Sequence, residues 1–178
     1  MQHRHRTRSQ GVTLIECCVV LAIVGTLSSI AVPGMQSALE SRRLSGAAAQ
    51  LATDIHFVRT EAVARNRSVR LSFHASGTSS CYVAHTGAAA ECSCSGAAAV
   101  CGPGAEQIKT VHLSPAEGVT LQANVASMVF DPLHGTTTPT GTLRVTAPSG
   151  RTVQHVVNLM GRVRSCSPSG AVPGYRAC

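Results

Sequence analysis

The sequence predicts an α+β protein in which one long N-terminal helix, transmembrane in its first half and amphipathic in its second half, packs on a β-rich domain. Three observations indicate this class. Residues 12–32 form an apolar run of 21 residues with a single charge, Glu16. Residues 35–66 repeat apolar side chains at helical spacing, and after Asn66 the period changes to two with many β-branched residues.

The composition bounds the size of the core and the kind of function. The chain has 178 residues, of which 44% are hydrophobic but only 3% aromatic. This suits one domain besides a membrane segment, with a core filled mainly by Val, Leu and Ala. Only 8 residues are acidic, and the sequence contains no His-x-x-Glu-His, Gly-x-Ser-x-Gly or phosphate-loop motif. We therefore expect no catalytic activity and no cofactor, although the 8 histidines leave an enzyme as an alternative.

The apolar run is long enough to cross a bilayer. At about 1.5 Å per residue it spans roughly the 30 Å hydrocarbon core. Residues 1–10 before it are polar and carry Arg4, Arg6 and Arg8, and such positive flanks remain cytoplasmic. We therefore expect a single membrane crossing with a cytoplasmic N-terminus and an exported C-terminal domain. The alternative is an ordinary secretory signal cut near residues 31–33, where the proline makes a poor cleavage site.

The second half of the predicted helix has one apolar face, whose members follow one another at steps of three and four. Only Pro33 interrupts the pattern, and a proline kinks a helix more readily than it ends one. We therefore expect one helix over residues 12–66. The face expected to pack on the domain consists of Leu44, Ala48, Leu51, Ile55, Val58 and Ala62. The polar residues expected largely on other faces are Arg43, Gln50, Asp54, Arg59, Glu61 and Arg65.

Segments of period two, separated by Gly, Pro and Ser, follow the helix. Residues 87–105 are rich in small residues and cysteine, and we expect a long loop there, because the segment is too long for a tight hairpin. Residues 166–178 contain two prolines and two glycines and should form an irregular tail. The predicted strands are 68–75, 80–86, 107–113, 118–122, 126–130, 142–147, 152–159 and 162–166.

Six cysteines follow the helix, and their even number in a loop-rich, exported region predicts disulfides. Cys166 and Cys178 are the favoured pair, because the Pro/Gly-rich segment between them can close on itself. The other four, which should form two more bonds with the pairing left open, are Cys81, Cys92, Cys94 and Cys101. The alternative is a zinc site made by the last three of these, but a Cys-x-Cys spacing suits a zinc knuckle poorly. We therefore expect no metal.

The segment Gly11-Val12-Thr13-Leu14-Ile15-Glu16 resembles the type IV prepilin cleavage motif, with Val12 in place of the usual Phe. The resemblance implies cleavage after Gly11 by a prepilin peptidase and N-methylation of Val12. It also implies that Glu16 neutralises the N-terminal amine of a neighbouring subunit during filament assembly. A carboxylate inside a bilayer costs about 3 kcal/mol and needs a partner. The alternative partner is the N-terminus of its own helix.

Three later segments are similar to landmarks of the GspH/FimT family of minor pilins and pseudopilins: residues 59–69, residues 130–135 and residues 156–164. The family fold is a long N-terminal helix on a β-rich, pilin-like domain of two sheets, which agrees with the change of period. The resemblance implies an inner-membrane protein with a periplasmic domain, assembled with other pilins or pseudopilins into a pilus or pseudopilus. The implied parts are a leader peptide over 1–11, the transmembrane part of the helix over 12–34, its amphipathic part over 35–66 and the exported domain over 67–178.

The two branches of this family differ in their partners. GspH-type members are minor pseudopilins of the type II secretion system, whereas FimT-type members are minor pilins of type IV pili, some of which bind DNA. Gly161-Arg162-Val163-Arg164 resembles the Gly-Arg-x-Arg motif tied to DNA binding in the FimT branch.

The residues of this motif give the resemblance a physical basis. On a strand, Arg162 and Arg164 face the same side, where two guanidinium groups suit phosphates, and Gly161 lets a backbone approach closely. After Asp131 the chain holds five arginines and no acidic residue. We therefore predict weak, non-specific binding of double-stranded DNA. The alternative is a solvated basic edge strand in a type II secretion pseudopilin that does not bind DNA.

Overall fold

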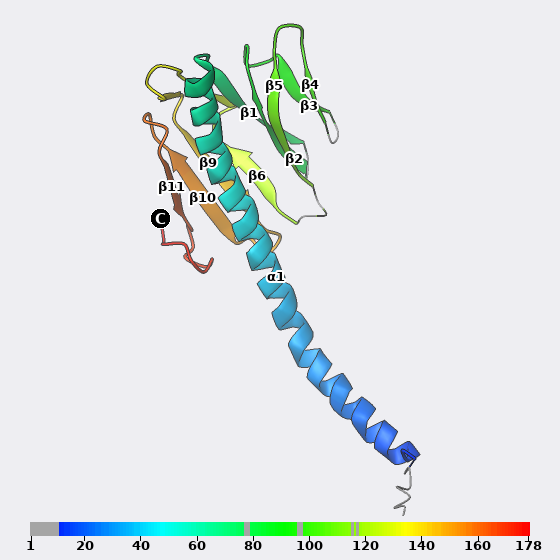
Figure 1. Cartoon of the computed structure of the whole chain (residues 1–178). Helices are drawn as coiled ribbons and strands as arrows, with labels where there is room; N and C mark the ends of the chain where they lie inside the picture. The colour runs from blue at the N-terminus through cyan, green and yellow to red at the C-terminus, as the bar shows by residue number, and fades with distance from the viewer. Residues whose placement is uncertain (1–10, 77–78, 96–97, 115, 117) are drawn as a thin grey trace, which may run out of the picture. The chain divides into compact units, whose positions relative to one another are not determined.

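The computed structural model describes residues 11–76, 79–95, 98–114, 116 and 118–178. The leader peptide predicted for residues 1–11 therefore lies, except for Gly11, outside the described residues. The chain divides into two compact units, Met1–Leu39 and Glu40–Cys178. One helix, α1 (Leu14–Arg65), contributes to both units (Figure 1). The predicted helix over residues 12–66 is confirmed.

Both ends of α1 follow from local sequence. At the start, the Thr13 carbonyl accepts the backbone N–H of Cys17, and the Thr13 hydroxyl accepts that of Glu16, so Thr13 is the N-cap. At the end, Asn66 adopts a positive φ of 48°. The N–H groups of Asn66 and Arg67 bond to the Val63 and Ala62 carbonyls, which is a Schellman motif with Asn in the left-handed position.

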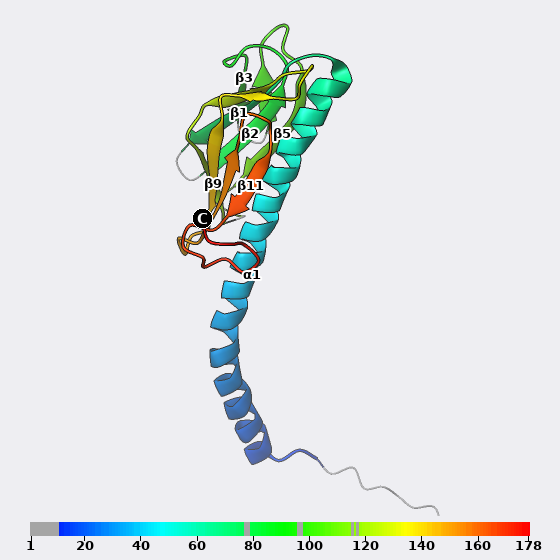
Figure 2. The same cartoon turned by 90° about the vertical axis from the view of Figure 1, so that its left-hand side faces the viewer.

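In the second unit, α1 runs along both sheets (Figures 1 and 2) and supplies the centre of the core. All six apolar residues predicted to face the domain, from Leu44 to Ala62, are at most 1% exposed, so this prediction is confirmed. Truncating a buried leucine such as Leu51 to alanine typically costs about 2–5 kcal/mol. Asp54, which the sequence placed largely away from this face, is instead 3% exposed.

Asp54 is buried because partners from two strands satisfy its carboxylate. The Tyr82 hydroxyl donates to one oxygen at 2.8 Å, and the Lys109 ammonium donates to the other at 2.6 Å. Lys109 also lies 5.7 Å from the centroid of the Phe57 ring, in a cation–π contact. Burial and the Asp54 carboxylate together raise the pKa of Tyr82, so its phenol remains a donor.

The first sheet has five antiparallel strands in the order β5-β2-β1-β7-β8. Its inner face carries apolar residues such as Leu71, Met128 and Phe130, each 0% exposed. Four of these strands were predicted, and the two-residue strand β8 was missed. The strands are β1 (Val69–Ser76), β2 (Ser79–His85), β5 (Gln107–Leu113), β7 (Ser127–Phe130) and β8 (Thr137–Thr138).

The second sheet has four antiparallel strands in the order β11-β10-β9-β6. Leu143, Val145, Val153 and Val157 point inward and are at most 1% exposed. All four strands were predicted, with ends that differ by one or two residues. The strands are β6 (Thr120–Ala123), β9 (Gly141–Thr146), β10 (Thr152–Val157) and β11 (Val163–Cys166).

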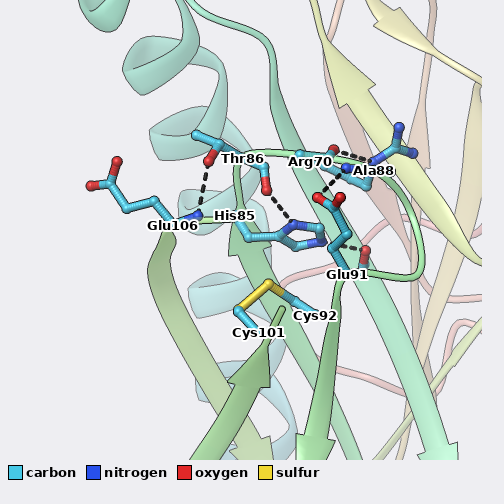
Figure 3. Close-up of a disulfide and its surroundings, with 10 residues drawn as sticks. Arg70, His85, Thr86, Ala88, Glu91, Cys92, Cys101 and Glu106 are labelled. Atoms are coloured by element: carbon cyan, nitrogen blue, oxygen red, sulfur yellow. Dashed lines mark hydrogen bonds between the residues drawn. A yellow bond between two sulfur atoms is a disulfide. The ribbon is translucent and has the colours of Figure 1, made fainter. Parts of the chain in front are cut away.

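The prediction of a loop over residues 87–105 was wrong, because the segment contains a hairpin of β3 (Cys92–Ser95) and β4 (Ala98–Cys101). Cys92 lies opposite Cys101 in this hairpin and forms a disulfide with it (Figure 3). A second disulfide, Cys81–Cys94, ties the hairpin to β2. The zinc alternative for Cys92, Cys94 and Cys101 is therefore wrong, since all three are disulfide-bonded. Covalent pairing thus orders a segment whose small side chains provide little packing.

His85 lies at the base of this hairpin and is completely buried. Its Nδ1 donates to the Thr86 carbonyl, and its Nε2 accepts from the Ser72 hydroxyl, both at 2.8 Å (Figure 3). His155, on β10, is also 0% exposed. Burial lowers the pKa of both imidazoles, because a charged ring loses its hydration there.

We predict that the domain loses stability in mild acid. Both histidines have a folded pKa below the unfolded value, which is about 6.5. Stability is therefore fully present above pH 6.5 and falls below it, because the unfolded chain takes up protons that the folded chain resists. Urea unfolding of the full chain at pH 7.5, 6.5 and 5.5 should show this decline.

The matched comparison uses a variant with His85→Gln and His155→Gln, and a control with the exposed His56 changed to Gln. The free energy of unfolding of the double variant, taken relative to its value at pH 7.5, should change less with pH than that of the wild type. The control should follow the wild type. An unchanged pH dependence in the double variant would show that other groups control the acid response.

Candidate functional site

The residues of the predicted cleavage and assembly site lie at the start of α1. Gly11 and Val12 precede the helix and are exposed, and Glu16 is exposed in its first turn. Thr13 and Glu16 occupy the N-cap and N3 positions, the spacing of a capping box. The Glu16 carboxylate therefore lies where the helix dipole favours a negative charge.

The chain around these residues is apolar on all sides. Every large apolar side chain between Leu14 and Leu39 is exposed, with Leu14 at 83% and Leu21 at 70%. By length and composition α1 can cross a membrane. Within the described residues, these side chains are covered by no other part of the chain.

The predicted DNA motif begins in the turn between β10 and β11. Asn158 organises this turn: its carbonyl accepts the N–H of Gly161 and its side-chain oxygen accepts the N–H of Arg162, both at 2.9 Å. Gly161 has a φ of +68°, which favours glycine. A Cβ on Gly161 would lie 3.1 Å from the Gly135 carbonyl oxygen and 3.2 Å from Cδ of Arg59. The close approach that Gly161 permits is therefore an approach by Gly135 and Arg59 of the same chain.

Arg59 links this turn to a second turn, between β7 and β8. Its Nε donates to the Gly135 carbonyl at 3.0 Å. In this second turn, the Asp131 carboxylate accepts the N–H groups of Leu133 and His134 at 3.0 and 2.8 Å. These bonds, chiefly the one from His134, hold the pKa of Asp131 below its usual value. The three segments that resemble family landmarks thus meet around one arginine side chain.

The two arginines of the motif are exposed at the edge of the four-stranded sheet. Arg162 and Arg164 are both exposed, whereas Val163 between them is half-buried and packs on the core. Arg162 lies just before β11, and Arg164 within it. Strand β11 is the outer strand of the four-stranded sheet (Figure 2), so the pair belongs to an edge of the sheet.

The other arginines after Asp131 differ in their exposure and in the contacts that they already make. Arg151 lies 3.4 Å from the Glu40 carboxylate, which also accepts a hydrogen bond from Ser149. These contacts, chiefly the Ser149 hydrogen bond, lower the pKa of Glu40. Arg144 and Arg176 are exposed. The charge available to an anionic ligand is therefore concentrated on Arg144, Arg162, Arg164 and Arg176.

The C-terminal tail is tied to the end of the same edge strand. Cys166, the last residue of β11, forms a disulfide with Cys178, the pair favoured by the sequence. Ser167 and Ala177 form a parallel bridge beside it, and Val172 is 1% exposed in the core. The tail is therefore irregular but packed. Within the described part of the chain, no three His, Cys, Asp or Glu side chains form a group that could hold a metal ion.

A family model for the type II transport protein GspH matches residues 47–161. The chain belongs to the GspH family. No curated protein and no solved structure matches the chain significantly. Membership indicates a pilin-like, minor pseudopilin role and an assembly with other pseudopilins, and the α+β pilin-like fold agrees with it.

The GspH match covers only some of the residues described above. The matched region contains Arg59, Gly135 and Gly161, whose contacts join the two turns. It ends immediately before Arg162, so both arginines of the motif and the Cys166–Cys178 disulfide lie outside it.

Sequence reasoning missed two residues near the candidate sites. Thr13 belongs to the predicted cleavage motif, and the Thr-x-x-Glu spacing before an apolar run signals a capping box. Arg59 was assigned only to a polar helix face. Its junction segment resembled a family landmark, but no local pattern reveals that its partner is Gly135, 76 residues away.

We predict that Gly161 is required for the stability of the folded domain. Gly161→Ala should lower the free energy of unfolding by about 1–3 kcal/mol, the usual cost of a strained backbone, and crowding against Gly135 and Arg59 should add to it. Gly150→Ala is the matched control, because Gly150 also has a positive φ, +83°, but has no neighbour within 4 Å of a Cβ. Urea unfolding should therefore rank Gly161→Ala as the more damaging change. Equal losses would mean that the contact with Arg59 contributes nothing.

Proposed function

We propose that this GspH-family chain is a minor subunit of a type II secretion pseudopilus or a type IV pilus, acting in filament assembly and in recognition at the filament tip. Its membrane helix serves first as an inner-membrane anchor, with the N-terminus cytoplasmic and the domain periplasmic. A prepilin peptidase cuts after Gly11, and Val12 becomes the methylated N-terminal residue. The same helix then moves into the filament core.

The observation that carries this proposal is the exposed apolar surface between Leu14 and Leu39. Such a surface needs a bilayer or other apolar helices around it. Glu16 is the single charge within it, and a carboxylate in that environment needs a cationic partner. Cleavage after Gly11 creates such a cation, the amine of Val12, and in a filament that amine belongs to the neighbouring subunit.

The test separates the assembly role of Glu16 from its role in starting the helix. Glu16→Val should leave membrane insertion intact, because it removes a charge from an apolar segment, but it should strongly reduce incorporation into filaments. Thr13→Val is the matched control, since it removes the capping hydroxyl and keeps the carboxylate. Incorporation is measured in sheared filament fractions, and mass spectrometry checks that each chain begins at Val12.

Normal incorporation of the Glu16→Val chain would leave the carboxylate with no assembly role. An equal loss in Thr13→Val would assign the effect to helix capping. A mature N-terminus near residue 31 would contradict the anchor itself, because the apolar segment would then have been removed as a secretory signal.

A second role, non-specific contact with double-stranded DNA, is favoured by one observation: Arg162 and Arg164 are both exposed beside an inward-facing valine. After Asp131 the chain contains no acidic residue that would repel phosphates. Among aromatic residues the C-terminal region offers only Tyr175, so binding rests on the phosphate backbone rather than on base stacking. The alternative is a type II secretion pseudopilin in which the basic edge only prevents strand-to-strand aggregation.

We predict that the full chain in neutral detergent binds labelled duplex DNA with an affinity that falls steeply between about 50 and 200 mM salt. Arg162→Ala with Arg164→Ala should flatten the log–log salt slope by roughly two units, because two phosphate contacts are lost. The control is Arg42→Ala with Arg43→Ala, which removes the same charge from α1 and should leave the slope unchanged. Equal loss in both double variants would indicate a net-charge effect, and no binding by the wild type would favour the alternative without DNA.

A further inference from the structure

The outer face of the four-stranded sheet carries a row of polar side chains that lies outside the Gly161–Arg164 motif. Along β9 and β10, inward residues such as Leu143 and Val153 are buried, so their neighbours point outward. The strand register aligns Gln122, Arg144 and Gln154 side by side on β6, β9 and β10. These four strands contain no aspartate or glutamate.

This row borders an open hollow of about 320 Å³. The polar side chains that line it are those of Gln122, Asn124, Thr142, Arg144 and Gln154. Arg144, Gln122 and Asn124 are exposed, and Gln154 and Thr142 are half-buried. The hollow is therefore open to a ligand from outside the sheet.

Hydrogen bonds within the protein leave this hollow rich in donors. The Gln154 side-chain oxygen accepts from Nε of Arg144 at 2.9 Å, and the Asn124 side-chain oxygen accepts the N–H of Thr142 at 2.7 Å. In both pairs the partner is an N–H group, so the amide atom facing it must be oxygen. Each bond occupies one of the two lone pairs of its amide oxygen, and the two amide NH2 groups and the terminal N–H groups of the guanidinium are left as donors.

A group of donors beside a positive charge and without a carboxylate suits an oxyanion. The register also connects the hollow to the basic edge, because Arg164 pairs with Val156 and Val156 pairs with Thr142. Two strand spacings and two residues along the strands put Arg144 and Arg164 roughly 12 Å apart between their Cα atoms. A ligand that reaches both must carry several anionic groups.

We propose that this hollow is a phosphate-binding subsite, which takes a backbone phosphate of a nucleic acid strand whose neighbouring phosphates lie on Arg164 and Arg162. This inference rests on the DNA contact proposed above and extends it from the sheet edge across the sheet face. Arg144 supplies the charge, and Gln154 fixes its guanidinium through the Nε bond. Asn124 and Gln154 add amide donors, and the 38% exposed Val156 gives an apolar surface between the two phosphate contacts.

The experiment compares single variants of the full chain in neutral detergent by titrating a labelled DNA duplex at three salt concentrations. Arg144→Ala should flatten the log–log salt slope by about one unit and weaken binding roughly eightfold at 0.1 M salt, as expected for one phosphate contact. Arg144→Lys keeps the charge but not the Nε bond, so it should keep most of the slope and bind more weakly than the wild type. Arg42→Ala is the control for net charge and should change neither quantity.

The outcomes distinguish this subsite from the proposed DNA role. If the Arg162/Arg164 double variant loses binding while Arg144→Ala binds as the wild type does, the edge contacts DNA and the hollow does not. If the wild type fails to bind duplex at about 50 mM salt, the DNA role and this subsite both fall. Equal weakening by Arg144→Ala and Arg42→Ala would also overturn the subsite, since any lost charge would then suffice. Thermal unfolding checks that each variant remains folded.

Discussion

Burial of one face of α1 is the constraint on which the domain depends. The five-stranded and four-stranded sheets share no hydrogen-bonded strand among the described residues. Their inner faces instead meet around the side chains from Leu44 to Ala62. Because each sheet needs an apolar layer to cover its inner face, the helix acts as a common partner for both. Arg59, on the same helix, then positions the two turns through its contacts with Gly135 and Gly161.

The period of apolar side chains predicted the elements in which one face is buried and the other is not. The six helix positions and strands such as β9 and β10 follow such a period, because burial on one side imposes it. Strand β2 departs from it, since every residue from Ser80 to His85 is buried. The hairpin of β3 and β4 escaped prediction, since alanine, glycine, serine and cysteine give no contrast between two faces. Its order comes from Cys81–Cys94 and Cys92–Cys101, and pairing among four cysteines cannot be read from sequence.

Polar residues were harder to place, because their partners are distant in sequence. Asp54 looked like a solvent-facing helix residue, and its burial depends on Tyr82 and Lys109 from two strands. The alternation of Arg162, Val163 and Arg164 was visible locally, and the exposure of both arginines beside a half-buried valine agrees with it. The hollow at Arg144 could not, because it requires the register of β6, β9 and β10 and the hydrogen bonds that occupy two amide oxygens.

The three disulfides span only 13, 9 and 12 residues of sequence. None joins α1 to a sheet or one of the two large sheets to the other; each secures the β3–β4 hairpin or the C-terminal tail. A loop of this length contributes about 3 kcal/mol in the chain-entropy model, and here the contribution falls on the periphery. The order of maturation follows from this placement. Helix and sheets can associate by apolar packing before any of these disulfides forms, and oxidation then secures the outer segments, including the end of the strand that carries Arg164.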